Sequence, residues 1–296
     1  MGDGDRTVRL PRDAEQELTE SLRRGLRTSE DGGPEAEDDT PESAFERTLS
    51  EGRRRLDRGL GALTATGLVG GIDVATGVLA FLVVQQMTGN ELLAGLAFTI
   101  GFIALTMARS ELFTENFLVP VIAVVAKQCT ARRLMRLWGG TIVFNLIGGW
   151  VVTYLVVSGY PKLHATAIES GQGYVAYGLG WRAFSLAMLG GLVITLMTWM
   201  QHTVESMGPK LVAAVTAAFL LGAGKLNHAI VASLMMFAAL HAGHAPFGYL
   251  QWAQAAGWAA LGNMVGGIGL VTLLRLLQVP DRVRNQRANA AGGVVE

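Results

Sequence analysis

The chain has 296 residues, of which 50% are hydrophobic and 16% are charged, and its formal net charge at neutral pH is zero. Soluble globular domains carry about 25% charged residues, so this composition argues against a soluble domain and for an integral membrane protein. A single cysteine, Cys129, excludes an intramolecular disulfide.

The first segment of the chain, residues 1–58, is hydrophilic and acidic. Residues 1–50 contain 14 Asp and Glu against 7 Lys and Arg, and they offer too few apolar side chains to bury a core. We therefore predict a disordered, acidic cytoplasmic tail over residues 1–58, in which a short helix across 43–56 is the one candidate element. A solvated tail is expected, with a regulatory or docking arm as the alternative.

Six apolar segments follow the tail and predict an all-α membrane domain over residues 59–278. A helix needs about 20 apolar residues to cross a hydrocarbon core about 30 Å thick. The segments that meet this requirement are residues 60–85, 92–127, 136–158, 181–203, 210–242 and 252–277. The second and the fifth are too long for one straight helix and contain polar interruptions at 109–111 and 222–228, so we predict that both spans are broken. Residues 279–296 are expected to form a basic cytoplasmic tail.

Basic residues are distributed unequally between the two sets of loops. One set, together with the regions that flank the first and last spans, contains thirteen Lys and Arg residues, whereas the other contains only Lys162 and Arg182. Because cytoplasmic loops of membrane proteins carry the excess of Lys and Arg, both termini are predicted to lie in the cytoplasm. We expect a multi-pass protein of a bacterial inner membrane.

A short motif recurs in the third and sixth spans and indicates an internal repeat. The Asn-X-X-Gly-Gly motif that begins at Asn145 recurs at Asn263, 118 residues later. Each unit contains three spans, an odd number, so the two halves must have opposite topology. Inverted repeats with discontinuous helices at matching positions are typical of transport sites near the bilayer midplane. We assign Asn145 and Asn263 a scaffolding role, because their amides can bond the irregular loops.

The break in the second span brings polar and aromatic side chains together. A helix that restarts after Thr114 directs its positive N-terminal end towards the break, which suits an anion, and the Thr114 hydroxyl can donate a hydrogen bond. Phe98 and Phe102 are four residues apart, share one helix face and are predicted to form an apolar gate with Phe113. The alternative is that these rings face lipid.

Two charged side chains interrupt the second span and are costly at membrane depth unless they are paired or hydrated. We expect Arg109 and Glu111 to neutralise each other in the loop or to cap the ends of the broken helix. A structural role is favoured for this pair over a role in transport.

In the fifth span, His228 lies where the chain re-enters a helix, directly after Asn227. Histidine exchanges a proton near neutral pH, so at the midpoint of a pore it could hydrogen-bond a passing anion or protonate it. A neutral weak acid crosses an apolar constriction at a much lower free-energy cost than its anion does. A hydrogen-bonded core histidine is the alternative. Lys225, three residues earlier, adds positive charge at the vestibule.

Three motifs together give the chain a resemblance to the formate/nitrite transporter family. They are Glu111-Leu112-Phe113-Thr114-Glu115-Asn116 in the second span, Asn227-His228 in the fifth, and Gly262-Asn263-Met264-Val265-Gly266-Gly267 in the sixth. The likeness covers about residues 60–278, and the acidic extension marks a divergent branch. It implies an aquaporin-like fold, a homopentamer with one pore per protomer, and passage of small monovalent anions such as formate, nitrite or hydrosulfide, often coupled to protons.

The resemblance also implies roles for individual side chains. Phe98, Phe102 and Phe113 match one apolar constriction, with Thr114 beside it. His228 matches the central pore histidine. Leu221 falls where the second constriction has an aromatic side chain.

Several positions depart from the family pattern. The lysine usual at the start of the fourth span corresponds to Val175, with Arg182 two turns further on, and the asparagine usual in the fourth span corresponds to Gly191. Arg109 and Lys225 add charge in loops that commonly carry small residues. These differences separate the chain from the formate channels of the family.

Other classes of function find little support in the sequence. The membrane body shows no nucleophile–base pair, phosphate-binding loop or clustered metal ligands, so neither an enzyme nor a cofactor is predicted. Nucleic-acid binding is not expected, because the basic residues follow the membrane edge. Two alternatives to an anion pore stay open: a channel for a neutral or cationic small solute, and a non-transporting scaffold or sensor whose activity lies in the acidic tail.

Overall fold

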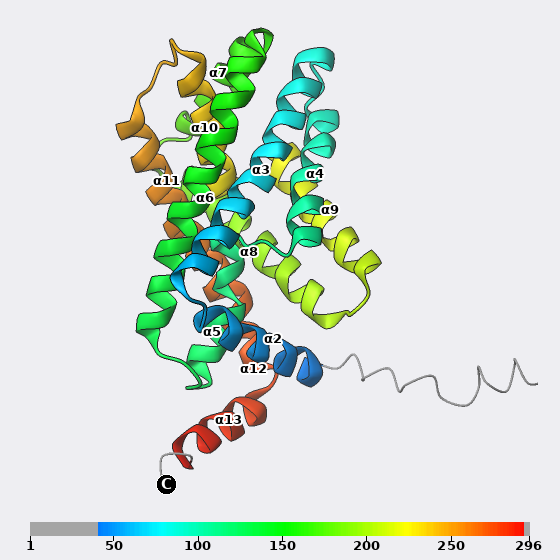
Figure 1. Ribbon diagram of the computed structural model, residues 1–296, viewed down its shortest axis with the longest axis vertical. Helices are drawn as coiled ribbons and strands as arrows, with labels where there is room; N and C mark the ends of the chain where they lie inside the picture. Colours follow the sequence, from blue (N-terminus) through cyan, green and yellow to red (C-terminus); the bar gives the residue numbers. More distant parts are fainter. Residues whose placement is uncertain (1–40, 293–296) are drawn as a thin grey trace, which may run out of the picture. The chain divides into compact units, whose positions relative to one another are not determined.

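The computed structural model describes residues 41–292 (Figure 1). Within this range every regular element is helical, so the prediction of an all-α fold is confirmed. Residues 1–40 and 293–296 lie outside the described residues. Most of the predicted N-terminal tail and the end of the predicted C-terminal tail therefore remain predictions.

Five stretches in the described range are long and apolar enough to cross a membrane by length and composition. They are α3 (Leu60–Thr88), α4 (Glu91–Ala108), α6 (Ala131–Gly159), α8 (Trp181–Thr203) and Tyr249–Leu277. The last stretch is made of α11 (Tyr249–Met264), the π-helix η3 (Val265–Thr272) and α12 (Leu273–Leu277).

Shorter helices complete the membrane body. The 3-10 helix η1 (Phe113–Phe117) and α5 (Val119–Val125) follow α4, while α9 (Met207–Ala223) and α10 (Ala229–Ala242) occupy the fifth apolar segment. The 3-10 turn η2 (Pro161–Leu163) and α7 (His164–Val175) connect α6 to α8.

Non-helical residues separate the helices within the second and fifth apolar segments, at 109–112 and at 224–228. A basic residue with a left-handed backbone begins or lies within each gap: Arg109 has φ of 53° and Lys225 has φ of 47°. A left-handed residue turns the chain out of the helix, and a cation is favoured beside the negative end of the helix dipole. The local sequence therefore ends α4 and α9 where polar residues interrupt the apolar runs.

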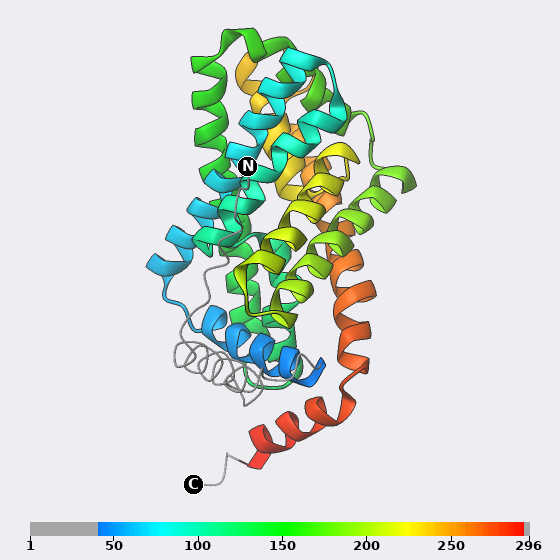
Figure 2. The ribbon, with the colours of Figure 1, turned by 90° about the vertical axis from the view of Figure 1, so that its right-hand side faces the viewer.

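The long helices pack side by side in a bundle, and α2 (Pro41–Leu56) lies across one end of it (Figures 1 and 2). α3 packs against α4 and α6, and α8 packs against α11 and η3. The helices of the fifth segment connect these groups, because α9 lies along α4 and α10 lies against α6 and α7.

Glycines at matching places let two pairs of helices approach closely. A Cβ atom added at Gly71 of α3 would lie 2.1 Å from the carbonyl oxygen of Asn145, and one added at Gly191 of α8 would lie 2.1 Å from that of Asn263. Small residues at helix contacts permit this close approach. Gly191, noted above as a departure from the family pattern, is therefore required by the contact with Asn263.

Residues 41–56, which the composition placed in a disordered tail with at most a short helix, form α2 and pack against α5. Phe45, Leu49 and Leu56 are buried. Their spacing gives α2 one apolar face, a local pattern that the acidic average of residues 1–50 conceals. The folded region therefore extends at least to Pro41 rather than beginning after residue 58.

The predicted basic tail also contains a helix, α13 (Pro280–Gly292). Arg287 Nε of this helix donates a hydrogen bond to the carbonyl oxygen of Val125 at 2.8 Å. Gln286 Nε2 lies 3.3 Å from a carboxylate oxygen of Glu46 in α2. α13 is thus tied to the same end of the bundle as α2 and α5.

Candidate transport site

Thr114 and His228 form a buried pair where the second and fifth apolar segments meet. Thr114 Oγ1 of η1 lies 2.7 Å from His228 Nε2, and both side chains are fully buried. His228 is also the N-cap of α10. The hydrogen bond therefore joins two interrupted stretches of chain that are 114 residues apart in sequence.

The hydrogen bonds of His228 indicate which ring nitrogen carries the proton. Nδ1 accepts a bond from the backbone N–H of Val231 at 3.3 Å, so this nitrogen must present its lone pair. In the neutral ring the proton then resides on Nε2, which donates to the Thr114 oxygen. The Thr114 hydroxyl keeps its own hydrogen to donate to a further acceptor, such as a bound anion.

Asn145 of α6 holds the irregular segment that precedes Thr114. Its Oδ1 accepts a hydrogen bond from the backbone N–H of Phe113 at 2.9 Å. Its Nδ2 donates to the carbonyl oxygens of Glu111 at 2.9 Å and of Gly67 at 2.8 Å. The fully buried amide thus supplies partners for the Glu111 carbonyl and the Phe113 N–H at the interruption and ties them to α3 through Gly67.

Asn263 of α11 makes the corresponding bonds on either side of His228. Its Oδ1 accepts from the backbone N–H of Ala229 at 2.8 Å, and its Nδ2 donates to the carbonyl oxygens of Asn227 at 3.0 Å and of Ala187 at 2.6 Å. Each of the two asparagines bridges a residue before an interruption, a residue after it and a carbonyl of a neighbouring helix.

The predicted gate residues fall into two aromatic groups. The rings of Phe98 and Phe102 lie 5.8 Å apart in α4, and both are fully buried. The ring of Phe113 instead makes an edge-to-face contact with Phe117, with centroids 4.9 Å apart. Leu221 of α9 is also fully buried. None of these side chains faces lipid in the isolated chain.

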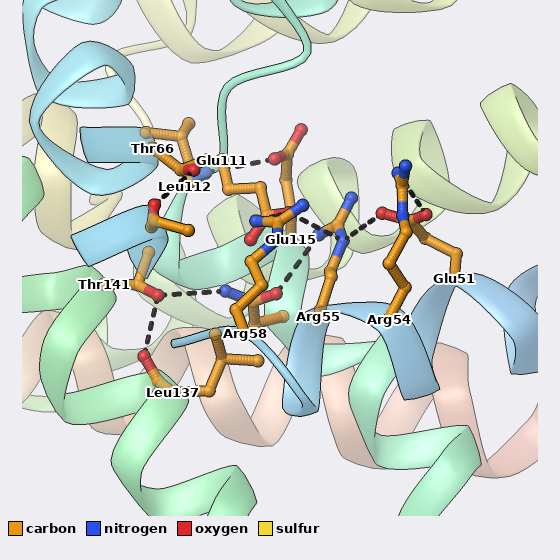
Figure 3. A network of polar contacts seen from close by, with 12 residues as sticks. Glu51, Arg54, Arg55, Arg58, Thr66, Glu111, Leu112, Glu115, Leu137 and Thr141 are labelled. Carbon is orange, nitrogen blue, oxygen red and sulfur yellow. Dashed lines mark hydrogen bonds and ion pairs between the residues drawn. The ribbon is translucent and has the colours of Figure 1, made fainter. Parts of the chain in front are cut away.

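Glu111 pairs with Arg55 of α2 and with Arg58, so the expected pairing with Arg109 is wrong, whereas Arg109 is the C-cap residue of α4, as the other expectation had it. Glu111 Oε1 lies 3.0 Å from Arg55 Nε and 2.6 Å from Arg58 Nη1 (Figure 3). Arg109 has a left-handed backbone at the end of α4 and an exposed side chain. The partners of Glu111 could not be found from sequence while residues 41–58 were assigned to a tail.

Arg55 connects α2 to both sides of Thr114. Besides contacting Glu111, it donates through Nη1 to Asn116 Oδ1 at 3.1 Å and through Nε to Glu51 at 2.9 Å. Burial raises the pKa of Glu51, but the neighbouring Arg55 and Arg54 outweigh that effect and hold this pKa below its usual range.

Sequence reasoning missed this cluster, although a signal was present. Two carboxylates in the motif that runs from Glu111 to Asn116 require cationic partners at membrane depth. The basic cluster at 53–58 supplies such partners through Arg55 and Arg58.

Three further charged residues, Lys225, Asp73 and Arg182, have partners within the protein. Lys225 Nζ lies 2.5 Å from Glu91 Oε1, and the carbonyl oxygen of Lys225 accepts a bond from the Tyr177 hydroxyl at 3.0 Å. Asp73 of α3 accepts a hydrogen bond from Ser110 Oγ at 2.5 Å. Arg182 lies over the Tyr177 ring at 5.5 Å.

Two cavities lie near the interrupted segments. The larger, about 420 Å³, is lined by residues of α2, by the end of α4 with Ser110, by Glu115 and by the chain between α8 and α9. The smaller, about 60 Å³, is lined by Tyr177 and Lys225 among others. The Thr114–His228 pair itself is closed to solvent.

The apolar helices and the buried polar site where the interrupted segments meet define a helical membrane transport protein. The model of the formate/nitrite transporter family matches residues 42–277, and the chain belongs to that family.

Relatives and solved structures agree with this assignment. The inner membrane protein YfdC of Escherichia coli (strain K12) is 26% identical over 270 residues, which cover 85% of this chain and 84% of that protein. The formate channel BtFdhC of Bacillus thuringiensis is 23% identical, covering 78% of this chain and 92% of that one.

Two solved structures share the fold. An FNT family ion channel has a TM-score of 0.70 and 19% identity, covering 80% of this chain and 99% of that chain. A pentameric formate channel with formate bound has a TM-score of 0.61 and 19% identity, covering 74% and 96%.

Proposed function

We propose that this protein conducts small monovalent anions, or their conjugate weak acids, across the membrane, with formate and nitrite as the first solutes to test. The observation that carries the proposal is the buried Thr114–His228 pair, which places a proton-exchanging ring beside a free hydroxyl donor. Membership of the formate/nitrite transporter family and a relative named as a formate channel support the same class of solute.

In this proposal the membrane domain consists of two inverted repeats of three spans, with an aquaporin-like arrangement. The first is formed by α3, the broken stretch from α4 to α5, and α6; the second by α8, the broken stretch from α9 to α10, and the stretch from α11 to α12. The matched bonds of Asn145 and Asn263 support this arrangement, because the two amides hold equivalent backbone groups. Both asparagines act as scaffolds.

The route passes apolar constrictions on either side of the Thr114–His228 pair. Phe98 and Phe102 form one constriction, and Leu221 of α9 contributes to the other. Phe113 borders the same site because it directly precedes Thr114. Asn227 directly precedes His228, and Asn263 holds its carbonyl by a hydrogen bond. An anion loses its hydration there, so conversion to the neutral acid lowers the barrier.

His228 is proposed to exchange the proton that accompanies the anion. An anion held by the Thr114 hydroxyl lies next to Nε2, the nitrogen that carries the proton in the neutral ring. The step starts from the imidazolium, because a neutral imidazole that lost its Nε2 proton would become an imidazolate. His228 first takes up a second proton on Nδ1, which displaces the bond from Val231, and then transfers the Nε2 proton to the anion. The ring is left neutral and must take up another proton before the next passage. Flux is therefore expected to depend on pH.

Assembly and location follow the family. We propose a homopentamer in a bacterial inner membrane with both termini in the cytoplasm. The larger cavity is then a cytoplasmic vestibule of the pore, and the small cavity beside Lys225 belongs to its periplasmic end. Each protomer supplies its own pore, because the pair and its supporting asparagines come from one chain.

The proposal is tested by solute flux into liposomes that contain the purified protein. Formate, nitrite, chloride, acetate and urea are compared at several pH values. Fast passage of formate and nitrite supports it. Passage of urea, or reversal potentials that follow a cation gradient, would favour the neutral- or cationic-solute alternative. If no solute moves and deletion of residues 1–52 alone removes the cellular phenotype, the scaffold or sensor alternative holds.

Substitution His228→Asn is expected to reduce formate flux several-fold and to flatten its pH dependence, because asparagine can bond Thr114 but cannot exchange a proton. Stopped-flow flux across a pH series measures both effects. His244→Asn is the matched control, because His244 is exposed and its left-handed backbone tolerates asparagine. A pH profile for His228→Asn that matches the wild type would remove the proton role.

A further inference from the structure

The 420 Å³ cavity next to α2 has the size of a small-ligand site and is rich in basic groups. Its basic side chains come from three directions. α2 provides Arg47, Arg54 and Arg55, the end of α4 provides Arg109, and the start of α9 provides Lys210.

The acidic groups of this cavity are largely occupied. Glu51 lies 2.5 Å from Arg54 and 2.9 Å from Arg55, so its charge is compensated within α2. Glu115 accepts a hydrogen bond from the backbone N–H of Leu112 at 3.0 Å. Glu205 is mostly exposed and lies 3.9 Å from Arg47.

Two of the cations, by contrast, have no internal partner. Neither the Arg109 guanidinium nor the Lys210 ammonium has a hydrogen bond or an ion pair within residues 43–290. They stand on separate elements, at the end of α4 and near the start of α9. Arg109 also occupies a left-handed position at the end of α4, where the helix dipole favours a cation but glycine would be less strained.

We propose that this cavity binds a multivalent oxyanion, a small di- or triphosphate or polycarboxylate, with Arg109 and Lys210 as its principal contacts. Guanidinium groups recognise carboxylate and phosphate oxygens in bidentate fashion, and an ammonium adds a point charge. A ligand with two or more charges can contact both walls at once, whereas a monovalent anion satisfies only one. The site therefore differs from the Thr114–His228 pair in the charge of its ligand.

Occupancy of this cavity would affect transport from one side. Ser110 and Glu115, which flank the segment that carries Thr114, both line it. An occupant would lie against this segment, at the end of the proposed pore where α2 lies. We therefore expect the ligand to slow flux when it is present on that side of the membrane. The cavity is then an inhibitory site for a ligand that the pore does not conduct.

The test measures binding without transport, so that its failure and the failure of the proposed function are distinguishable. Full-length protein in lipid nanodiscs is titrated calorimetrically with pyrophosphate at constant ionic strength, and with chloride for comparison. We expect saturable binding of one pyrophosphate per chain and none of chloride. Lys210→Gln and Arg109→Gln should each weaken binding at least tenfold, while Lys210→Arg retains it.

Lys162→Gln is the matched control, because Lys162 lies in η2, outside the lining of this cavity. It should bind pyrophosphate as the wild type does. Elution volume and thermal unfolding confirm that each variant is folded. If one glutamine variant does not fold, the other still tests the proposal, because Arg109 and Lys210 lie on different elements. Absence of saturable binding, or equal binding by the wild type and both glutamine variants, would overturn the proposal.

Discussion

Replacement of Gly266 by alanine is expected to lower the yield and the unfolding temperature of the folded protein markedly. Gly266 lies in the π-helix η3, and a Cβ atom there would lie 1.9 Å from the carbonyl oxygen of Met188 in α8. Backbone atoms cannot rotate away as a side chain can, so η3 and α8 would have to separate. Overpacking of a close contact costs about 1–3 kcal/mol and sometimes more.

Gly269→Ala is the matched control for this change. Gly269 lies in the same π-helix, and a Cβ atom added there has no neighbour within 4 Å. Yield after extraction and the temperature of thermal unfolding are measured for both variants in the same detergent. The Gly269 variant should behave as the wild type does, whereas equal unfolding temperatures for the two variants would show that η3 and α8 do not pack this closely.

Arg55→Met is expected to lower the free energy of unfolding by about 3–5 kcal/mol, the usual cost of removing one partner from a buried ion pair. The side chain of Glu111 is only 3% exposed and would lose one of its two arginines, while Asn116 would lose a hydrogen bond. Methionine preserves the length and apolar contacts of the arginine stem, so the loss reports mainly on charge.

Arg54→Met is the corresponding control. Arg54 pairs with the same Glu51 as Arg55 does, but its side chain is 64% exposed, against 10% for Arg55. Exposed ion pairs contribute about 0–1 kcal/mol, so this variant should unfold close to the wild type. If Arg55→Met were as stable as Arg54→Met, the network between α2 and the Thr114 segment would not contribute to stability.

The same network predicts a dependence of stability on acid. The folded-state pKa of Glu51 is lowered relative to the unfolded chain, because its arginine partners outweigh the effect of burial. Its contribution to stability is therefore present above the ordinary pKa of a glutamate and is lost as pH falls through the folded value. In Arg55→Met this acid-dependent loss should be smaller, since Arg54 alone remains beside Glu51.

The class of fold could be predicted from the sequence because the strongest signal is the length of the apolar runs. Apolar runs of about 20 residues leave little choice except helices that cross a membrane. The ends of α4 and α9 also fall at the polar residues where interruptions were expected. The pairing of Thr114 with His228 was foreseeable, since both lie where a helix resumes after an interruption.

Other features depend on contacts between distant segments, which composition does not report. A short helix was expected across 43–56, but the acidic average of residues 1–50 placed it in a solvated tail, although its apolar spacing gives it one face to bury. Its packing against the membrane body was therefore missed, and Arg55 and Arg58 were not recognised as partners of Glu111. Phe113 was grouped with Phe98 and Phe102 by proximity to the interruption, whereas the structure turns its ring towards Phe117.

Formate efflux from liposomes that contain either the wild-type protein or Thr114→Val tests the central claim most directly. Valine keeps the shape of threonine but removes the hydroxyl that bonds His228 and that we propose meets the anion. Thr216→Val is the control, because Thr216 is exposed on α9 and, among the residues that the structure describes, bonds its own helix alone. We predict fast efflux for the wild type and Thr216→Val and a loss of at least tenfold for Thr114→Val. Efflux no faster than from empty liposomes, or equal efflux from all three proteins, would contradict the account.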